Sequence, residues 1–416
     1  MSKLPKPVKV GVIGCGTICR MTYMPNMMNK FQIIEVVGVA DLIPERSKAM
    51  AEQYGVKQMT NEEIYNDPEI EVVVNLTYPE SHFEVSRDAM LHGKGVYCEK
   101  MMAVDFAEAT ELMRIAKEKG VMYTTAPDTF LGAWEQSARF YVDNGIVGRP
   151  VSIHAQHTCS YRPANPIFDL SPDSFFFPLH PGGGLPFDWG GYYLHTMLNI
   201  LGPIKRVTGF AGTYEPVMKY THPRHPKYGE DFEVNTPTSI FGALEFESGV
   251  HGTFHLTSDS YGSESFVLTG TEGTLDLGNP NNFDGTLRIH RSNMKEKPMM
   301  FPGQGGPGGR GGNGAPVAAS QLGEFAMPEV MDLPMLFGYN DSSRGVGLAD
   351  MCYAMRNGRK PRVHCDIGYH AMEVIHGMLE STKTGKVYEM TSHFERPAPL
   401  KPSNLVGTAQ EATLND

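Results

Sequence analysis

Three side chains that can transfer or orient protons, Asp188, Tyr192 and His195, stand four and then three residues apart. A helix turns by about 100° per residue, so the three fall within about 60° of one another and one helix could present them all to a single cleft. A neutral histidine is the better base near neutral pH, whereas a tyrosine serves if a nearby cation stabilises its phenolate. Tyr192 and His195 therefore both remain candidates for the catalytic base. The same residues would also suit a helix packed on a sheet, with Asp188 as its N-cap.

A glycine-rich turn is the second chemical signal. Gly14-x-Gly16-x-x-Cys19 directly follows an apolar run and opens a segment with helical spacing. In a dinucleotide-binding turn the first glycine permits the tight turn, and the second lets backbone N–H groups approach the pyrophosphate. Cys19 takes the third position, where glycine or alanine is usual.

Asp41 ends the next strand and could bind the adenosine ribose. Its carboxylate repels a 2′-phosphate and no arginine directly follows it, so we predict NAD as the cofactor.

The elements that must position these residues alternate in the N-terminal third. Apolar runs predict strands at 8–13, 33–40, 72–76, 95–98 and 121–124, and helical patterns end at 29 and span 44–54, 81–92 and 106–119. This alternation predicts an α/β Rossmann fold, a parallel, doubly wound sheet covered on both faces. We expect the NAD-binding domain to comprise residues 1–127.

The pattern changes after residue 132. A helical pattern at 134–144 precedes strand patterns at 207–213, 239–246, 250–258, 265–269, 274–277 and 286–290, with further helices at 345–356 and 367–382. These predict a substrate-binding α+β C-terminal domain with a mainly antiparallel, open sheet over residues 128–397. Residues 302–316 are mostly glycine and predict a loop, and residues 398–416 predict a polar tail.

The segment Gly95-Val-Tyr-Cys-Glu99-Lys100 and the stretch around Asp188 make the sequence resemble the Gfo/Idh/MocA oxidoreductases over nearly its whole length. In that family a Glu-Lys-Pro motif ends the fifth Rossmann strand. The resemblance implies that Lys100 meets the substrate hydroxyl beside the cofactor and that Asp188 is catalytic. Met101 replaces the proline, which often sets a cis peptide near the nicotinamide.

The family also bears on the base. Inositol dehydrogenases commonly have a histidine four residues after the aspartate, whereas this chain has Tyr192. The tyrosine resembles the glucose-fructose oxidoreductase and dihydrodiol dehydrogenase branches, in which it is the acid/base, helped by the lysine. His195 lies one turn further and stays the rival.

Other candidates follow from the same resemblance and from neighbouring positions. For the cofactor we expect contacts from Gly14, Gly16, Thr17, Ile18, Asp41, Thr77, His82, Glu99 and Lys100. For the substrate we expect contacts from Asp128, Thr129, Tyr161, Arg162 and Trp189, whose aromatic faces could stack on sugar C–H surfaces.

Composition excludes several classes of protein. The formal net charge is −11 and no basic stretch could track a phosphate backbone, so we expect no nucleic-acid partner. No run approaches the ~18 apolar residues of a membrane span, and the N-terminal residues do not read as a secretory signal. Six cysteines without a Cys-x-x-Cys pair suit reduced thiols, so we expect a soluble cytoplasmic protein. Three histidine pairs lack a further ligand at suitable spacing, so we expect no metal.

Together these features predict an NAD-dependent enzyme that transfers hydride between the nicotinamide and a secondary hydroxyl of a sugar or glycoside. Oxidation at C3, and a retained cofactor that shuttles hydride between two carbohydrates, are finer hypotheses. An NAD-using glycosidase and a catalytically inactive sugar sensor stay open. The antiparallel sheet commonly forms an interface in relatives, so we expect a homo-oligomer.

Overall fold

The structure is a computed structural model that describes residues 5–160, 181–220, 223, 226–291 and 329–400. The expected loop at 302–316, residues 401–416 of the expected tail, and the candidates Tyr161 and Arg162 lie outside these ranges.

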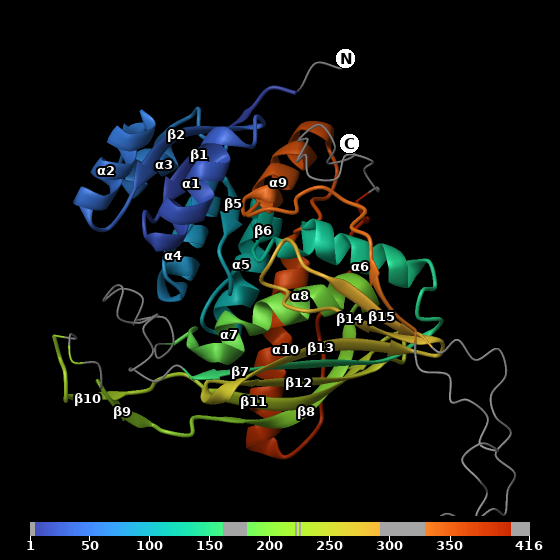
Figure 1. Ribbon diagram of the computed structural model, residues 1–416. Helices are drawn as coiled ribbons and strands as arrows, with labels where there is room; N and C mark the ends of the chain where they lie inside the picture. Colours follow the sequence, from blue (N-terminus) through green and yellow to red (C-terminus); the bar gives the residue numbers. More distant parts are fainter. Residues whose placement is uncertain (1–4, 161–180, 221–222, 224–225, 292–328, 401–416) are drawn as a thin grey trace, which may run out of the picture.

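The N-terminal part of the chain, drawn in blue to teal in Figure 1, contains a six-stranded sheet in the order β3-β2-β1-β4-β5-β6. Every pairing within it is parallel, which confirms the predicted Rossmann sheet. The strand order reverses between β1 and β4, where such sheets bind ligands at their carboxyl edge. The strands are β1 (Val8–Ile13), β2 (Ile34–Ala40), β3 (Lys57–Gln58), β4 (Val72–Asn75), β5 (Gly95–Cys98) and β6 (Tyr123–Thr125).

The helices of this domain begin and end at residues with recognisable capping chemistry. Thr60 and Asp105 form capping boxes with glutamates three residues later, and Gly55 and Gly120 end their helices in the left-handed conformation. Pro79 starts α4 two residues before the predicted position, because proline suits a first helical turn. The elements are η1 (Cys19–Tyr23, a π-helical segment), α1 (Met24–Asn29), α2 (Pro44–Tyr54), α3 (Asn61–Asn66), α4 (Pro79–Leu91) and α5 (Phe106–Lys119).

The second sheet has nine strands in the order β16-β15-β14-β13-β7-β12-β11-β8-β17. The predicted mainly antiparallel sheet is confirmed, with one parallel pairing between β7 and β12. Outside it, β9 (Val217–Lys219) pairs with β10 (Asp231–Glu233). The nine strands are β7 (Pro150–Ser160), β8 (Ile204–Gly212), β11 (Ser239–Phe246), β12 (His251–Thr257), β13 (Asp259–Gly270), β14 (Gly273–Asp276), β15 (Leu287–Arg291), β16 (Glu329–Leu333) and β17 (Tyr388–Glu389).

The central strand β7 was not predicted, and the reason lies in its residues. It alternates polar side chains with few buried apolar ones, Ile153 and Ala155. A strand flanked on both sides gains its stability from its neighbours, so its own hydrophobic pattern is weak.

Helices fill the space between the two sheets (Figure 1). Every residue of α8 is buried, as expected for a helix surrounded by protein. The predicted single helix carrying Asp188, Tyr192 and His195 is wrong in detail: α7 ends at Asp188, and α8 begins at Gly190 after a turn at Trp189, next to two glycines of low helix propensity. The remaining helices are η2 (Thr129–Leu131), α6 (Ala133–Asp143), α7 (Gly184–Asp188), α8 (Gly190–Leu201), α9 (Val346–Asn357) and α10 (Cys365–Thr384).

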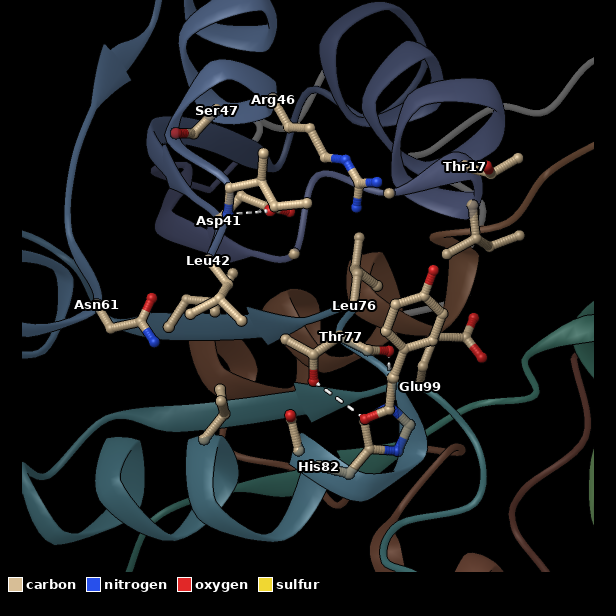
Figure 2. Close-up of a pocket in the computed structure, with 18 of the residues that line it drawn as sticks. Thr17, Asp41, Leu42, Arg46, Ser47, Asn61, Leu76, Thr77, His82 and Glu99 are labelled. Carbon is tan, nitrogen blue, oxygen red and sulfur yellow. Dashed lines mark hydrogen bonds between the residues drawn. The ribbon is translucent and has the colours of Figure 1, made fainter. Parts of the chain in front are cut away.

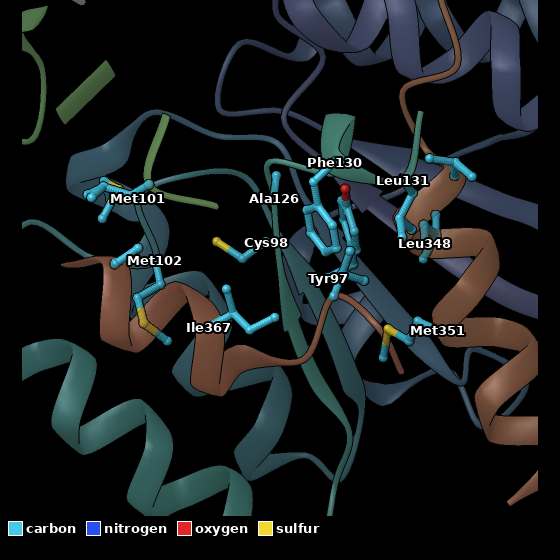
Figure 3. Packing of buried hydrophobic residues seen from close by; sticks show 14 of the residues in the cluster. Tyr97, Cys98, Met101, Met102, Ala126, Phe130, Leu131, Leu348, Met351 and Ile367 are labelled. Carbon is cyan, nitrogen blue, oxygen red and sulfur yellow. The ribbon is translucent and has the colours of Figure 1, made fainter. Parts of the chain in front are cut away.

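Helix α9 follows the second sheet in sequence but packs on the first. Figure 3 shows Met351 and Leu348 of α9 beside Tyr97 of β5. The sulfur of Met351 accepts a hydrogen bond from Thr124 of β6 at 3.1 Å, and Arg356 forms an ion pair with Glu71 at 2.7 Å. The Rossmann sheet therefore shares one core with the C-terminal part of the chain.

None of the described helices is both long enough and apolar enough to cross a membrane.

Candidate active site

A cavity of about 1160 Å³ opens at the carboxyl edge of the Rossmann sheet. Its walls come from the ends of β1, β2, β4 and β5, and Figure 2 shows Asp41, Thr77, His82 and Glu99 around one space. The second domain closes the far end with Asp188, Tyr192, Asn281 and Arg344.

The glycine-rich turn is shaped for close approach of a ligand. Gly14 has φ +100°, and an added Cβ would lie 2.6 Å from the carbonyl carbon of Leu76, so this position requires glycine. A Cβ on Gly16 would meet nothing within 4 Å, because this residue faces the open cavity. Thr17 and Ile18 line the same space.

Asp41 directly follows β2 and lines the cavity. Its carboxylate accepts hydrogen bonds from the backbone N–H of Cys15 at 2.6 Å and of Ile43 at 2.8 Å. Sequence reasoning missed Arg46, which lines the cavity with Asp41 (Figure 2). Arg46 does not directly follow Asp41 in the sequence; it lies in the first turn of α2, which brings it to the cavity.

His82 and Thr77, both expected as cofactor contacts, line the same cavity. The two ring nitrogens of His82 lie 2.6 Å from the carbonyl oxygen of Met101 and 3.1 Å from that of Thr77. Burial lowers the pKa of His82, so the ring is neutral and donates to one of these carbonyls. The contact holds the segment after Lys100, where the Lys100–Met101 peptide is cis although no proline is present.

Lys100 and Asp188 form a buried ion pair across the two domains. The Lys100 ammonium contacts the Asp188 carboxylate and donates to the Asp188 carbonyl oxygen at 3.1 Å. Burial acts to lower the pKa of Lys100, but the surrounding Asp188, Tyr192 and Glu99 outweigh it and raise the pKa. Lys100 is therefore a cation at any physiological pH.

Glu99 is the second anion of the site. Its carboxylate accepts hydrogen bonds from the hydroxyl of Tyr23 at 2.6 Å and from the backbone N–H of Lys100 at 3.0 Å. Burial acts to raise the pKa of Glu99, but Lys100 and Arg344 outweigh it and lower the pKa. Glu99 is thus ionised although buried.

Two cations lie beside Tyr192. Arg344 donates a hydrogen bond from Nη2 to the phenol oxygen at 2.9 Å. The Lys100 Nζ and the Arg344 Cζ lie 5.1 and 5.2 Å from the ring centroid. Arg344 also donates to the amide oxygen of Asn281. Arg344 and Asn281 were missed because no sequence spacing relates them to Tyr192, which stands 152 residues from Arg344.

His195 and Trp189 lie apart from this arrangement. Within the described ranges the cavity lining does not include either residue. The His195 ring is buried beside Phe130, its Nδ1 lies 2.7 Å from the carbonyl oxygen of Gly191, and burial lowers its pKa to about 4. Trp189 stacks on His157 with ring centroids 4.1 Å apart.

Asp128 and Thr129 are also buried rather than exposed to a ligand. Asp128 accepts hydrogen bonds from the backbone N–H groups of Gly345 at 2.8 Å and Gly347 at 3.0 Å. It therefore caps the start of α9. Neither Asp128 nor Thr129 belongs to the cavity lining within the described part of the chain.

Comparison with known proteins accounts for both domains. Residues 8–126 match the oxidoreductase family with an NAD-binding Rossmann fold, and residues 136–276 match the Gfo/Idh/MocA C-terminal domain. The chain belongs to the Gfo/Idh/MocA family.

Members of this family that resemble the chain are 1,5-anhydro-D-fructose reductase of Ensifer adhaerens and inositol 2-dehydrogenase/D-chiro-inositol 3-dehydrogenase of Lactiplantibacillus plantarum. The first is 26% identical over 70% of this chain and 77% of the relative, and the second 27% identical over 37% of this chain and 45% of the relative. The solved structure of levoglucosan dehydrogenase with NADH and levoglucosan has a TM-score of 0.71 at 19% identity, covering 93% of this chain and all of the other. The similarity to the levoglucosan dehydrogenase structure shows that the two chains share a fold.

The N-terminal domain of this family member is an NAD-binding Rossmann domain, and its residues fit that cofactor. The open space at Gly16 leaves room for a pyrophosphate at the backbone, and Asp41 places a carboxylate where the adenosine ribose is bound in such folds. Among the described residues, no three His, Cys, Asp or Glu side chains are grouped as metal ligands.

Replacing Gly16 with valine is expected to weaken NAD binding at least about tenfold, because the new side chain fills the space of the pyrophosphate. Isothermal titration calorimetry measures the affinity. Gly212→Val is the matched control, since a Cβ there also meets nothing within 4 Å and Gly212 lies on β8, outside the cavity. Unchanged NAD affinity in a folded Gly16→Val protein would contradict this interpretation.

The buried His195 makes stability depend on pH. Its folded pKa of about 4 lies below the unfolded value of about 6.5, so the unfolded chain binds the extra proton first and stability falls as the pH drops from about 6.5 to 4. His195→Gln removes up to about 3 kcal/mol of this loss. Denaturant unfolding at several pH values measures the slope, with the exposed His251→Gln as the control. Equal slopes in parent and His195→Gln would refute the assignment.

Proposed function

We propose that the chain is an NAD-dependent dehydrogenase that acts on a secondary hydroxyl of a sugar or glycoside. The observation that carries the proposal is the arrangement of Lys100, Asp188 and Tyr192 at the end of the cofactor cavity. A cation and a phenol there can handle the hydroxyl proton of a bound alcohol.

Each of these residues has a separate role in the proposed reaction. Lys100 donates a hydrogen bond to the reacting oxygen of the substrate, and Asp188 keeps Lys100 charged and in place. Tyr192, as the phenolate, takes the hydroxyl proton in oxidation and, as the phenol, returns it in reduction. NAD, when bound, accepts or supplies the hydride at the carbinol carbon. Closure of the cavity by the second domain holds the two reactants together.

Tyr192 is a better base than His195 in this arrangement. Tyr192 lines the cavity, whereas the ring of His195 is buried beside Phe130 and one of its nitrogens faces the Gly191 carbonyl. A general base must reach the proton that it removes, so the geometry supports Tyr192 as the base.

The names of the relatives support a polyhydroxylated ring as the substrate. They act on anhydrofructose and inositols, and the solved neighbour is bound to levoglucosan. We propose a glycoside oxidised at C3. The tyrosine in place of the histidine supports a cofactor that is retained and reoxidised by a second carbohydrate.

A panel of sugars and aryl glycosides, added to the purified protein with and without NAD, tests the proposal by the absorbance of reduced nicotinamide. We expect reduction of NAD, at one equivalent per protein if the cofactor is retained. Tyr192→Phe and Lys100→Met are each expected to lower the rate by at least about a hundredfold while NAD affinity changes little, because each removes a proton-handling group. Full turnover in Lys100→Met would refute the mechanism.

Other products of the same assay identify the alternatives. Release of the aglycone without net reduction of NAD would indicate a glycosidase that oxidises only transiently. Sugar binding without either reaction would indicate a sensor.

We also propose that the chain forms a homo-oligomer through the outer face of the nine-stranded sheet. Gly242 of β11 faces Met378 of α10, so the adjacent Phe241 points away from the helices. Phe241 is 46% exposed, pairs with the 79% exposed Phe210 across β8, and stacks on His255 of β12 at 3.8 Å. An exposed apolar row of this kind is typical of an interface.

We also propose a cytoplasmic location, which the six free thiols support.

Phe210→Glu combined with Phe241→Glu is expected to convert the oligomer to monomers, because the charges would be buried at the interface. Light scattering gives the mass, and Leu91→Glu on α4, at the surface of the other domain, is the control. A monomer mass for the unchanged protein would refute self-association.

A further inference from the structure

Arg344 is the residue of the site whose role the reaction has not yet used. It lies two residues before the start of α9 and is 8% exposed, yet its side chain lines the cavity. Its Nη2 donates to the phenol oxygen of Tyr192 at 2.9 Å, which is the atom that receives the substrate proton in the proposed function.

The backbone at Arg344 is held in place from two directions. Asp128 holds the backbone directly after it through the N–H groups of Gly345 and Gly347. Asn26 of α1, in the helix that follows the glycine-rich turn, donates to the Arg344 carbonyl oxygen at 2.8 Å. Arg344 is thus anchored to both the cofactor domain and the capped start of α9.

A purely structural arginine would have a hydrogen-bond partner for each buried N–H group, whereas one buried nitrogen of Arg344 has none among the described residues. Among the described residues, its buried Nη1 has no hydrogen-bond partner. An unpaired buried donor costs free energy and is rare, which favours a functional reason for the charge at this point. Burial acts to lower the pKa of Arg344, but Tyr192, Glu99, Tyr23 and Asp128 outweigh it and raise the pKa, so the group stays charged.

We propose that Arg344 is a positioning residue that holds the Tyr192 oxygen and stabilises negative charge on it, which adjusts the pH range in which Tyr192 exchanges the substrate proton. The inference rests on the proposed function. In oxidation the substrate O–H bond breaks and its proton moves to the Tyr192 oxygen, while the electron pair of the C–H bond leaves as hydride to NAD. Arg344 transfers no proton in either direction; it favours the phenolate form by Coulomb attraction and a charge-assisted hydrogen bond.

Carbon-13 NMR of protein labelled at the tyrosine ring carbon that bears the oxygen tests this without any substrate, and Tyr192→Phe assigns the signal. In Arg344→Gln the midpoint pH for ionisation of Tyr192 is expected to rise by about one unit or more, because an opposite charge in contact has been removed. Arg344→Lys keeps the charge without the planar fork, so a smaller rise is expected. Arg362→Gln, which removes an equally buried arginine beside α9, is the control for general destabilisation and is expected to leave the midpoint unchanged.

The pH profile of kcat/KM for NAD reduction is the second readout. The rising limb of oxidation is expected to move to higher pH by the same amount in Arg344→Gln, with little change in the NAD affinity. If Arg344→Gln does not fold, the inference is tested by the smaller rise expected in the Tyr192 midpoint pH of Arg344→Lys. An unchanged Tyr192 midpoint in every folded Arg344 variant overturns the inference. A raised midpoint in a protein without dehydrogenase activity supports the role of Arg344 and refutes the proposed function instead.

Discussion

Two cations buried beside one phenol are the constraint on which the rest of the structure depends. Lys100 and Arg344 could not stay charged in the interior without anions, and Asp188 and Glu99 supply them. Lys100 and Glu99 follow β5, Asp188 ends α7, and Arg344 precedes α9. The fold must therefore bring three distant stretches of chain to one point, and both sheets serve this end.

The packing between the sheets keeps that point rigid. α8 is buried on every side, α9 lies on the Rossmann sheet, and Asp128 ties the start of α9 to the residues after β6. A site held by helix ends and strand ends keeps its geometry more closely than one held by loops. The same arrangement places the described helices on the other face of the second sheet, and aromatic residues such as Phe210 are exposed on its outer face.

The parts of this structure that could be predicted are those with a local signal. The strand, turn and helix around Gly14 and Gly16 follow from apolar runs and glycine chemistry, and the residues Lys100 and Asp188 from short motifs. β7 was missed because its pairing partners, rather than its own polar sequence, stabilise it. Arg344 was missed because its role depends on a contact with Tyr192, 152 residues away in the sequence. Asp128 was expected to contact the substrate but caps α9, because a buried cap and a substrate ligand can have the same residue type.

The position of α9 has a consequence for how the chain is made. The strands of the Rossmann sheet are complete at Thr125, whereas the helix that covers Tyr97 and Thr124 begins at Val346. At a synthesis rate of roughly 5–20 residues per second, apolar surface on this sheet waits on the order of ten seconds or longer for its cover. During that interval the nascent domain exposes the surface that Met351 covers in the complete structure.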